Sequence, residues 1–101
     1  MTVELLYFDG CPSHPALLAH VRELLACLGS DLDVEQTRID DDDAARRHRF
    51  LGSPTVRVDG RDVEPGADAR DDFGLKCRLY STPDGLRGTP TDGWILDALA
   101  R

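Results

Sequence analysis

A cysteine follows a β-type run directly in the stretch YFDGCPSHPALL, residues 7–18, which continues into an apolar helical pattern. A cysteine at such a turn lies near unpaired backbone N–H groups and the positive end of the helix dipole, and both favour the thiolate. His14 follows Cys11 by about one helical turn, so its ring could reach the sulfur as a cation or as a neutral base. The alternatives are that His14 only lies over the sheet and that Cys11 is an unreactive small residue. Because a thiolate is both a nucleophile and a soft-metal ligand, the turn fits either chemistry.

The other two cysteines suggest different roles. In a reducing cytosol a structural disulfide is not expected, so each thiol is either a small buried residue or a reactive or metal-binding group. Cys77 lies in the run LKCRLY, residues 75–80, and if this run is a strand, Cys77 shares its inward face with the two leucines. Cys77 is then either part of the core or a second thiol folded back over Cys11. Cys27 lies on the flank of its predicted helix, and we interpret it as structural.

A second motif, GSPT at residues 52–55, precedes a predicted strand. If the Ser53–Pro54 peptide bond is cis, the backbone groups of Ser53 are exposed beside Cys11 and can pair with an extended thiol or peptide. The alternative is an ordinary trans turn. We therefore predict Pro12, Ser53 and Pro54 as substrate-binding residues.

The formal net charge of −7 argues against nucleic acid or an anionic membrane as a partner, because both attract clustered Lys and Arg. Arg46, Arg47 and Arg49 do cluster, but they follow the acidic run Asp40–Asp43. We expect them to compensate that run rather than bind phosphate. No basic region of a signal peptide and no stretch of roughly 20 apolar residues is found, so we expect a cytoplasmic location.

The hydrophobic pattern predicts one α/β domain over residues 1–101. The predicted elements are a strand over Val3–Phe8, a helix from Pro12 to Gly29, a strand within Asp33–Ile39, a short helix over Asp42–Phe50, paired strands Thr55–Val58 and Arg61–Val63, a loop over Glu64–Gly74, a strand candidate over Leu75–Tyr80, a turn at Pro83–Gly85 and a closing helix over Thr91–Ala100. The order β-α-β-α-β-β-α predicts a four-stranded mixed sheet flanked by helices on both faces.

This order and the two motifs resemble the thioredoxin fold. The chain also resembles a group of short actinobacterial thioredoxin-like proteins with the patterns Y-F-x-G-C-P, G-S-P-T-V-x-V-x-G and C-R-x-Y. Proteins of this group are sometimes labelled alkylmercury lyase-like. The resemblance implies that Cys11 is the nucleophile and that Pro54 is cis and faces it. Two features depart from the thioredoxin pattern: His14 replaces the second cysteine of the active-site pair, and the segment Glu64–Pro90, which contains Cys77, is longer than usual.

These observations favour a thiol-dependent oxidoreductase of thioredoxin type that uses a single thiol. Cys11 would attack a small disulfide or a protein disulfide, and release would need Cys77 or a small thiol. Reduction of a peroxide through a sulfenic acid at Cys11 is a variant. The alternatives are a soft-metal protein in which Cys11 and Cys77 bind mercury or copper(I), and a non-catalytic module of the same fold. The oxidoreductase needs no cofactor and no resident metal.

Overall fold

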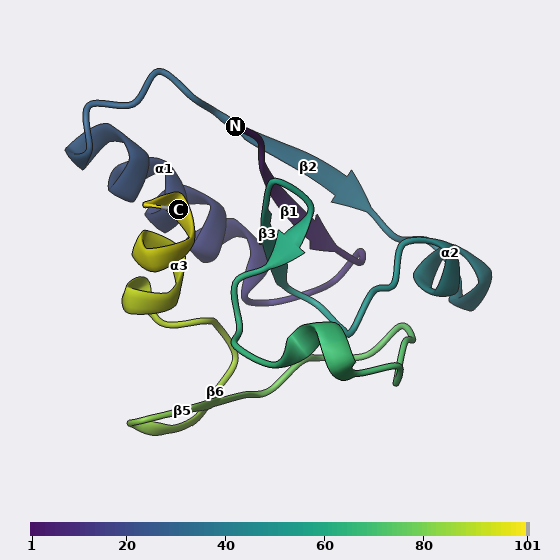
Figure 1. Cartoon of the computed structure of the whole chain (residues 1–101). Helices are drawn as coiled ribbons and strands as arrows, with labels where there is room; N and C mark the ends of the chain where they lie inside the picture. The colour runs from purple at the N-terminus through teal and green to yellow at the C-terminus, as the bar shows by residue number, and fades with distance from the viewer. Residues whose placement is uncertain (101) are drawn as a thin grey trace.

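The structure, a computed structural model, describes residues 1–100 and contains a four-stranded mixed sheet with helices on both faces (Figure 1). Strand β1 (Val3–Tyr7) is central because it pairs in parallel with β2 (Val34–Arg38) and antiparallel with β3 (Thr55–Val58). Strand β4 (Arg61–Asp62) completes the order β2-β1-β3-β4. The other elements are helices α1 (His14–Cys27), α2 (Asp42–Arg47) and α3 (Asp92–Leu99), the 3₁₀ turn η1 (Ala67–Ala69), and a separate hairpin of β5 (Tyr80–Thr82) and β6 (Gly85–Arg87). The predicted four-stranded mixed sheet is therefore confirmed, with η1 and the hairpin as additions.

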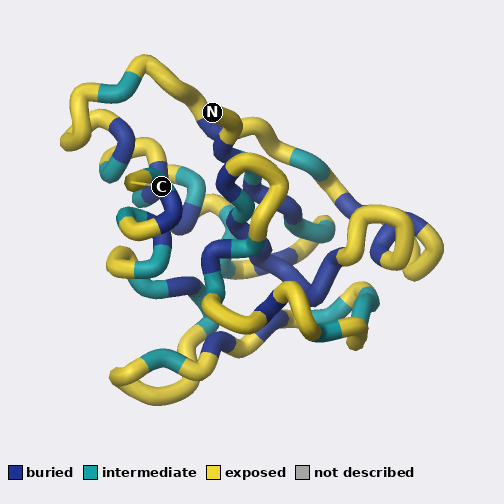
Figure 2. Tube along the Cα trace, viewed as in Figure 1, coloured by how far each residue is buried: buried dark blue, intermediate teal, exposed yellow. Residues whose placement is uncertain are grey.

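One face of the sheet is apolar and is covered by α1 and α3 (Figures 1 and 2). Leu17, Val21 and Leu25 form the buried stripe of α1, and Ile95 and Ala98 are the buried residues of α3. They pack against alternate residues of β1 and β3, because successive side chains of a strand point to opposite faces. Full burial of one such Leu, Ile or Val side chain stabilises the fold by roughly 1.5–3 kcal/mol. This packing fixes α1 against the sheet and thereby fixes the turn that joins β1 to α1.

The opposite face is covered by α2 over a smaller apolar cluster. The cluster contains Leu6, Ile39, Ala44, Ala45 and Phe50. Because α2 has only six residues, most of this face lies beyond its reach. The segment between β4 and β5 also contacts this face, where Arg78 donates to Thr55 Oγ1 at 3.0 Å.

Local signals set the ends of the helices. The Thr91 hydroxyl accepts a hydrogen bond from Trp94 N at 3.1 Å, so Thr91 caps α3 as predicted. Gly29, with a φ of +70°, terminates α1 as predicted. Helix α1 begins later than expected, and Pro15 rather than Pro12 lies in its first turn. Within residues 1–100, no helix combines the length and apolarity that a membrane crossing requires.

The segment 64–90 differs most from the sequence-based expectation. Its first part includes η1 within the predicted loop. The predicted strand over residues 75–80 is wrong, because only Cys77 forms an isolated bridge there and regular pairing starts at Tyr80. The predicted turn at 83–85 is confirmed as the connection of the β5–β6 hairpin, which lies apart from the main sheet in Figure 1.

Candidate functional site

Cys11 lies in the turn between β1 and α1, at the carboxyl end of β1. Its backbone N–H donates to Phe8 O at 3.2 Å, and its carbonyl accepts from His14 N at 3.4 Å. Cys11 is 8% exposed, and α1 starts three residues later, at His14. The thiol therefore precedes the first helical residue rather than lying in the first turn.

His14 lies over the sheet at the start of α1. Its ring stacks on the ring of Tyr7, with centroids 3.7 Å apart and planes 4° apart. Its Nε2 is 3.2 Å from Gln36 Oε1, on the neighbouring strand β2. Among residues 1–100, no hydrogen bond joins the ring to Cys11. Of the two arrangements that the sequence allowed, the structure has the one in which the imidazole packs on the sheet.

The Ser53–Pro54 segment approaches the Cys11 turn through Phe8. The Ser53–Pro54 peptide bond is cis, as predicted. Phe8 N donates to Ser53 Oγ at 3.4 Å, and Phe8 O accepts from Cys11 N. One residue at the end of β1 thus contacts both of the motifs that the sequence singled out.

The backbone of Ser53 is already paired within the chain. Ser53 N donates to Lys76 O at 2.8 Å, and Ser53 O accepts from Arg78 N at 2.9 Å. These bonds form a parallel bridge between Ser53 and Cys77. The expectation that the Ser53 backbone is free for an extended ligand is therefore wrong, because residues 76–78 occupy both groups.

Gly52 allows this close approach. A Cβ at this position would lie 2.9 Å from Arg78 Cβ and 3.1 Å from Lys76 O, and Gly52 has a φ of +128°. Both the short distances and the positive φ exclude other residues without a local rearrangement. The GSPT motif therefore contacts the 76–78 segment through Gly52 and Ser53, and its Thr55 begins strand β3 of the sheet.

The side chains of the 76–80 segment face the opposite way from the prediction. Cys77 is exposed and Leu79 is 61% exposed, whereas Arg78 is 2% and Tyr80 0% exposed. The predicted inward Cys77 is thus wrong. The physical reason is that Arg78 finds buried acidic partners on the inner side, which compensate the cost of removing its charge from water.

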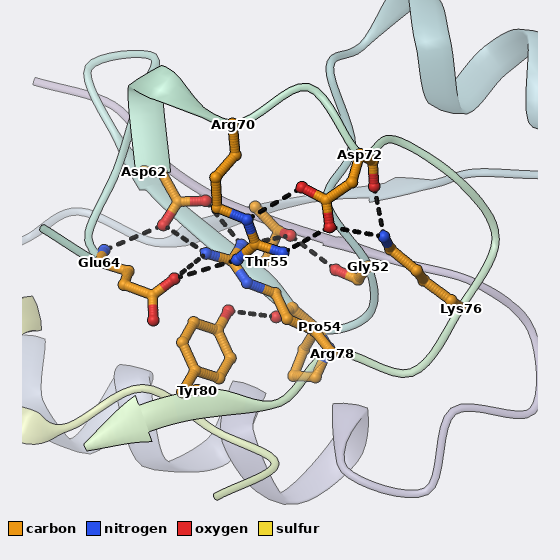
Figure 3. A network of polar contacts seen from close by, with 10 residues as sticks. All are labelled: Gly52, Pro54, Thr55, Asp62, Glu64, Arg70, Asp72, Lys76, Arg78 and Tyr80. Carbon is orange, nitrogen blue, oxygen red and sulfur yellow. Dashed lines mark hydrogen bonds and ion pairs between the residues drawn. The ribbon is translucent and has the colours of Figure 1, made fainter. Parts of the chain in front are cut away.

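Arg78 is the centre of a buried polar network (Figure 3). Its guanidinium donates to the two carboxylate oxygens of Asp62 at 2.6 and 3.1 Å and to Glu64 Oε1 at 2.9 Å. It also donates to Thr55 Oγ1 at 3.0 Å and lies 4.3 Å above the ring of Tyr80. Its Nε is buried and has no partner in the part of the chain that the structure describes. The network fastens the 76–80 segment to β3 and β4.

Protonation states in this network are shifted by burial and charge. Burial alone would lower the pKa of Arg78, but its hydrogen bonds to Asp62 and Glu64 and the nearby negative charge raise it above its ordinary value. Burial raises the pKa of Tyr80 well above its ordinary value, so the phenol stays neutral. Its hydroxyl donates to Pro54 O. The second motif is therefore held by a neutral donor and a permanent cation.

A more exposed shell extends the network outward. Arg70 donates to both Asp72 oxygens at 3.0 and 2.7 Å, and Lys76 Nζ donates to Asp72 Oδ2 at 2.8 Å. Hydrogen bonds from Arg70 and then Lys76 lower the pKa of Asp72. Arg70 Nη1 also lies 3.5 Å from Glu64 Oε1, which links this shell to the buried network.

Sequence reasoning missed the residues of this network. A signal was present in Asp62-Val63-Glu64, where two acids flank a buried valine and so share one face of an extended chain. Their partner Arg78 is 16 and 14 positions away from them, and no local pattern specifies that pairing.

The chain after the hairpin also passes the cysteine turn. A Cβ placed on Gly88 would lie 3.2 Å from Ser13 Oγ, so this backbone lies against the turn that carries Cys11. Cys27, in contrast, is the last residue of α1 and is exposed. Within residues 1–100, no three His, Cys, Asp or Glu side chains gather as a metal site.

The arrangement brings a nearly buried thiol and a polar, tightly fastened loop to one end of the sheet. Exchange with another sulfur at such a thiol requires access and deprotonation. No protein-family model, curated protein or solved structure matched the chain.

Proposed function

We propose that the protein is a thiol-dependent oxidoreductase of thioredoxin type, with Cys11 as its nucleophile. The observation that carries the proposal is the contact of Phe8 with both Cys11 and Ser53, which joins the cysteine turn to the GSPT loop. The order of β1, α1, β2, β3 and β4 and their mixed pairing are consistent with that fold.

The reaction is thiol–disulfide exchange. The Cys11 thiolate attacks one sulfur of a disulfide, forms a new S–S bond to it, and the other sulfur leaves as a thiolate. A second thiolate then attacks the bound sulfur, forms a disulfide with it and releases Cys11 as a thiolate. Each step consumes one thiolate and releases one, so an external small thiol restores the enzyme directly. If Cys77 is the second thiol, the bound half of the substrate passes to Cys77, and a small thiol must then remove it as a disulfide.

Two features favour a small disulfide over an extended protein segment. Cys11 is only 8% exposed, which limits the size of the group that reaches its sulfur. The Ser53 backbone is paired with residues 76–78 and is not free to bind another chain. Exposed Cys77 lies beside Ser53 and is the candidate within the chain for the second thiol.

The test is the formation of a mixed disulfide with oxidised glutathione, mapped by peptide mass spectrometry in wild type, Cys11→Ser and Cys27→Ser. We expect Cys11 to react at least about tenfold faster than Cys27, although Cys27 is the more exposed thiol. Cys27→Ser is the matched control and should leave the Cys11 rate unchanged. Equal rates for the two thiols would refute the proposal.

If Cys77 supplies the second thiol, Cys77→Ser should accumulate the Cys11 adduct, and added reduced glutathione should then release it. If the adduct decays at the wild-type rate in Cys77→Ser, release depends on an external thiol alone.

A further inference from the structure

A small cavity lies on the polar face of the sheet, away from the cysteine turn. It has a volume of about 90 Å³. Its charged lining residues are three arginines, Arg49, Arg57 and Arg70, and two aspartates, Asp62 and Asp68, and Phe73 also lines it. Asp62 pairs with Arg78, Asp68 with Arg61 and Arg70 with Asp72, so Arg49 and Arg57 are the lining cations without an acidic partner among the described residues. One water needs only about 10–15 Å³ on a comparable measure, so the cavity has room for a group of several atoms.

Arg57 enters the cavity with most of its donors free. Its Nη2 donates to the carbonyls of His48 and Arg49, which follow α2. Its Nε and Nη1 have no hydrogen-bond partner in the described part of the chain. No carboxylate there pairs with any nitrogen of the Arg57 guanidinium. A guanidinium carries five N–H donors, so three remain available.

Arg49 brings a second positive charge to the same cavity. Its guanidinium lies 5.1 Å from the ring centroid of Phe73 and has no acidic partner within the described residues. Of the three arginines expected to compensate the acidic run, Arg46 forms an ion pair with Asp43, whereas Arg47 and Arg49 form none within residues 1–100. The backbone of Arg49 has a φ of +53°, which directs the chain back toward β3 after α2.

The two guanidiniums repel each other, and the partial burial of Arg57 adds to the cost of its charge. Burial, the largest effect, lowers the pKa of Arg57, and the positive charges of Arg78 and then Arg49 act more weakly in the same direction. The carboxylates of Glu4 and Asp62 oppose the shift only in part. Asp62 is already bound by Arg78 through two hydrogen bonds. A bound anion would give the guanidiniums of Arg49 and Arg57 the direct partner that no carboxylate of residues 1–100 provides.

We propose that this cavity is a binding site for a small oxyanion, a phosphate or carboxylate group held by Arg49 and Arg57. Guanidiniums suit both groups because their planar donors match pairs of oxygens. The free donors of Arg57 provide the hydrogen bonds, and Arg49, held on Phe73, closes the site. The site is independent of Cys11 and of the proposed exchange reaction.

The test is an NMR titration of the full chain with sodium phosphate and, separately, sodium acetate, each against sodium chloride at the same ionic strength. We expect saturable shifts of the Phe73 amide and the Arg57 side chain for at least one of the two oxyanions. We expect Arg49→Gln to weaken binding about tenfold, the loss of one charged partner.

Arg47→Gln is the matched control. It removes the same charge two positions away, from an exposed residue that does not line the cavity, and should change the affinity by less than about twofold. Arg57→Gln should abolish binding. Because Arg57 also holds the chain after α2, circular dichroism is used to check that the Arg57→Gln variant folds. If the Arg57→Gln variant is unfolded, the result for Arg49→Gln decides the test. The proposal is overturned if neither oxyanion gives more than the chloride effect, or if Arg47→Gln and Arg49→Gln weaken binding equally.

Discussion

The two faces of the sheet are stabilised by different forces. The face under α1 and α3 is a continuous apolar cluster that includes Leu5, Val56 and Ile95. The other face combines a smaller apolar cluster with the Arg78 network, since Thr55 and Asp62 lie on that side of β3 and β4. Apolar burial is non-directional and tolerates small changes of shape, whereas a buried ion pair depends on every partner. The loop beside Cys11 is therefore held by buried ion pairs, which tolerate substitution less well than apolar packing does.

The largest effect should come from breaking the network at its centre. Arg78→Met removes the cation, leaves Asp62 without an ion-pair partner and leaves Glu64 with only its 3.5 Å contact to Arg70. We expect a loss of about 3–5 kcal/mol in the free energy of unfolding. Urea denaturation measures it. Arg46→Met, which breaks the exposed pair with Asp43, is the control and should cost at most about 1 kcal/mol. Similar losses for the two variants would contradict the difference between the faces.

A smaller effect is expected on the apolar face. Ile95 is 0% exposed, and Ile95→Val removes one methylene group from it. We expect a loss of about 0.5–1.5 kcal/mol, because the surrounding side chains relax only in part. The loss should be the same at low and high salt, since no charge is involved. A strong salt dependence would show that the two faces are coupled.

The smallest effect should come from the outer shell of the network. Asp72 has a lowered pKa and a side chain that is 49% exposed, so solvent screens much of its interaction with Arg70 and Lys76. We expect Asp72→Asn to cost at most about 1 kcal/mol at pH 7 and less at high salt.

The sign of the pH dependence follows from the lowered pKa. The unfolded chain binds the Asp72 proton at about pH 4, before the folded chain does, so the contribution of Asp72 is present above that pH and is lost as the pH falls below it. The difference between wild type and Asp72→Asn in urea unfolding should therefore shrink from pH 7 to pH 3. A difference that grows on acidification would be inconsistent with this assignment.

The parts of the fold that were predictable are those with local signals. The cap at Thr91, the end of α1 at Gly29 and the strand Thr55–Val58 were all read from neighbouring residues and are confirmed. The orientation of residues 76–80 was not predictable from neighbouring residues. Arg78 is a charged residue, and it is buried only because acids distant in the sequence pair with it. The alternation rule placed Cys77 inside and Arg78 outside, and tertiary pairing reversed both.

The 76–78 segment has a further consequence for how the protein behaves at high concentration. A sheet edge with free backbone N–H and C=O groups is a template for pairing with a second chain and for aggregation. Strand β4 pairs with β3 over only two residues. At Ser53, just before β3, residues 76–78 of the same chain occupy the backbone N–H and C=O groups. At the other edge, β2 presents exposed Glu35 and Arg38, which discourage such pairing by charge. Gly52, by letting the segment come close, thus helps to keep one edge of the sheet from joining another molecule.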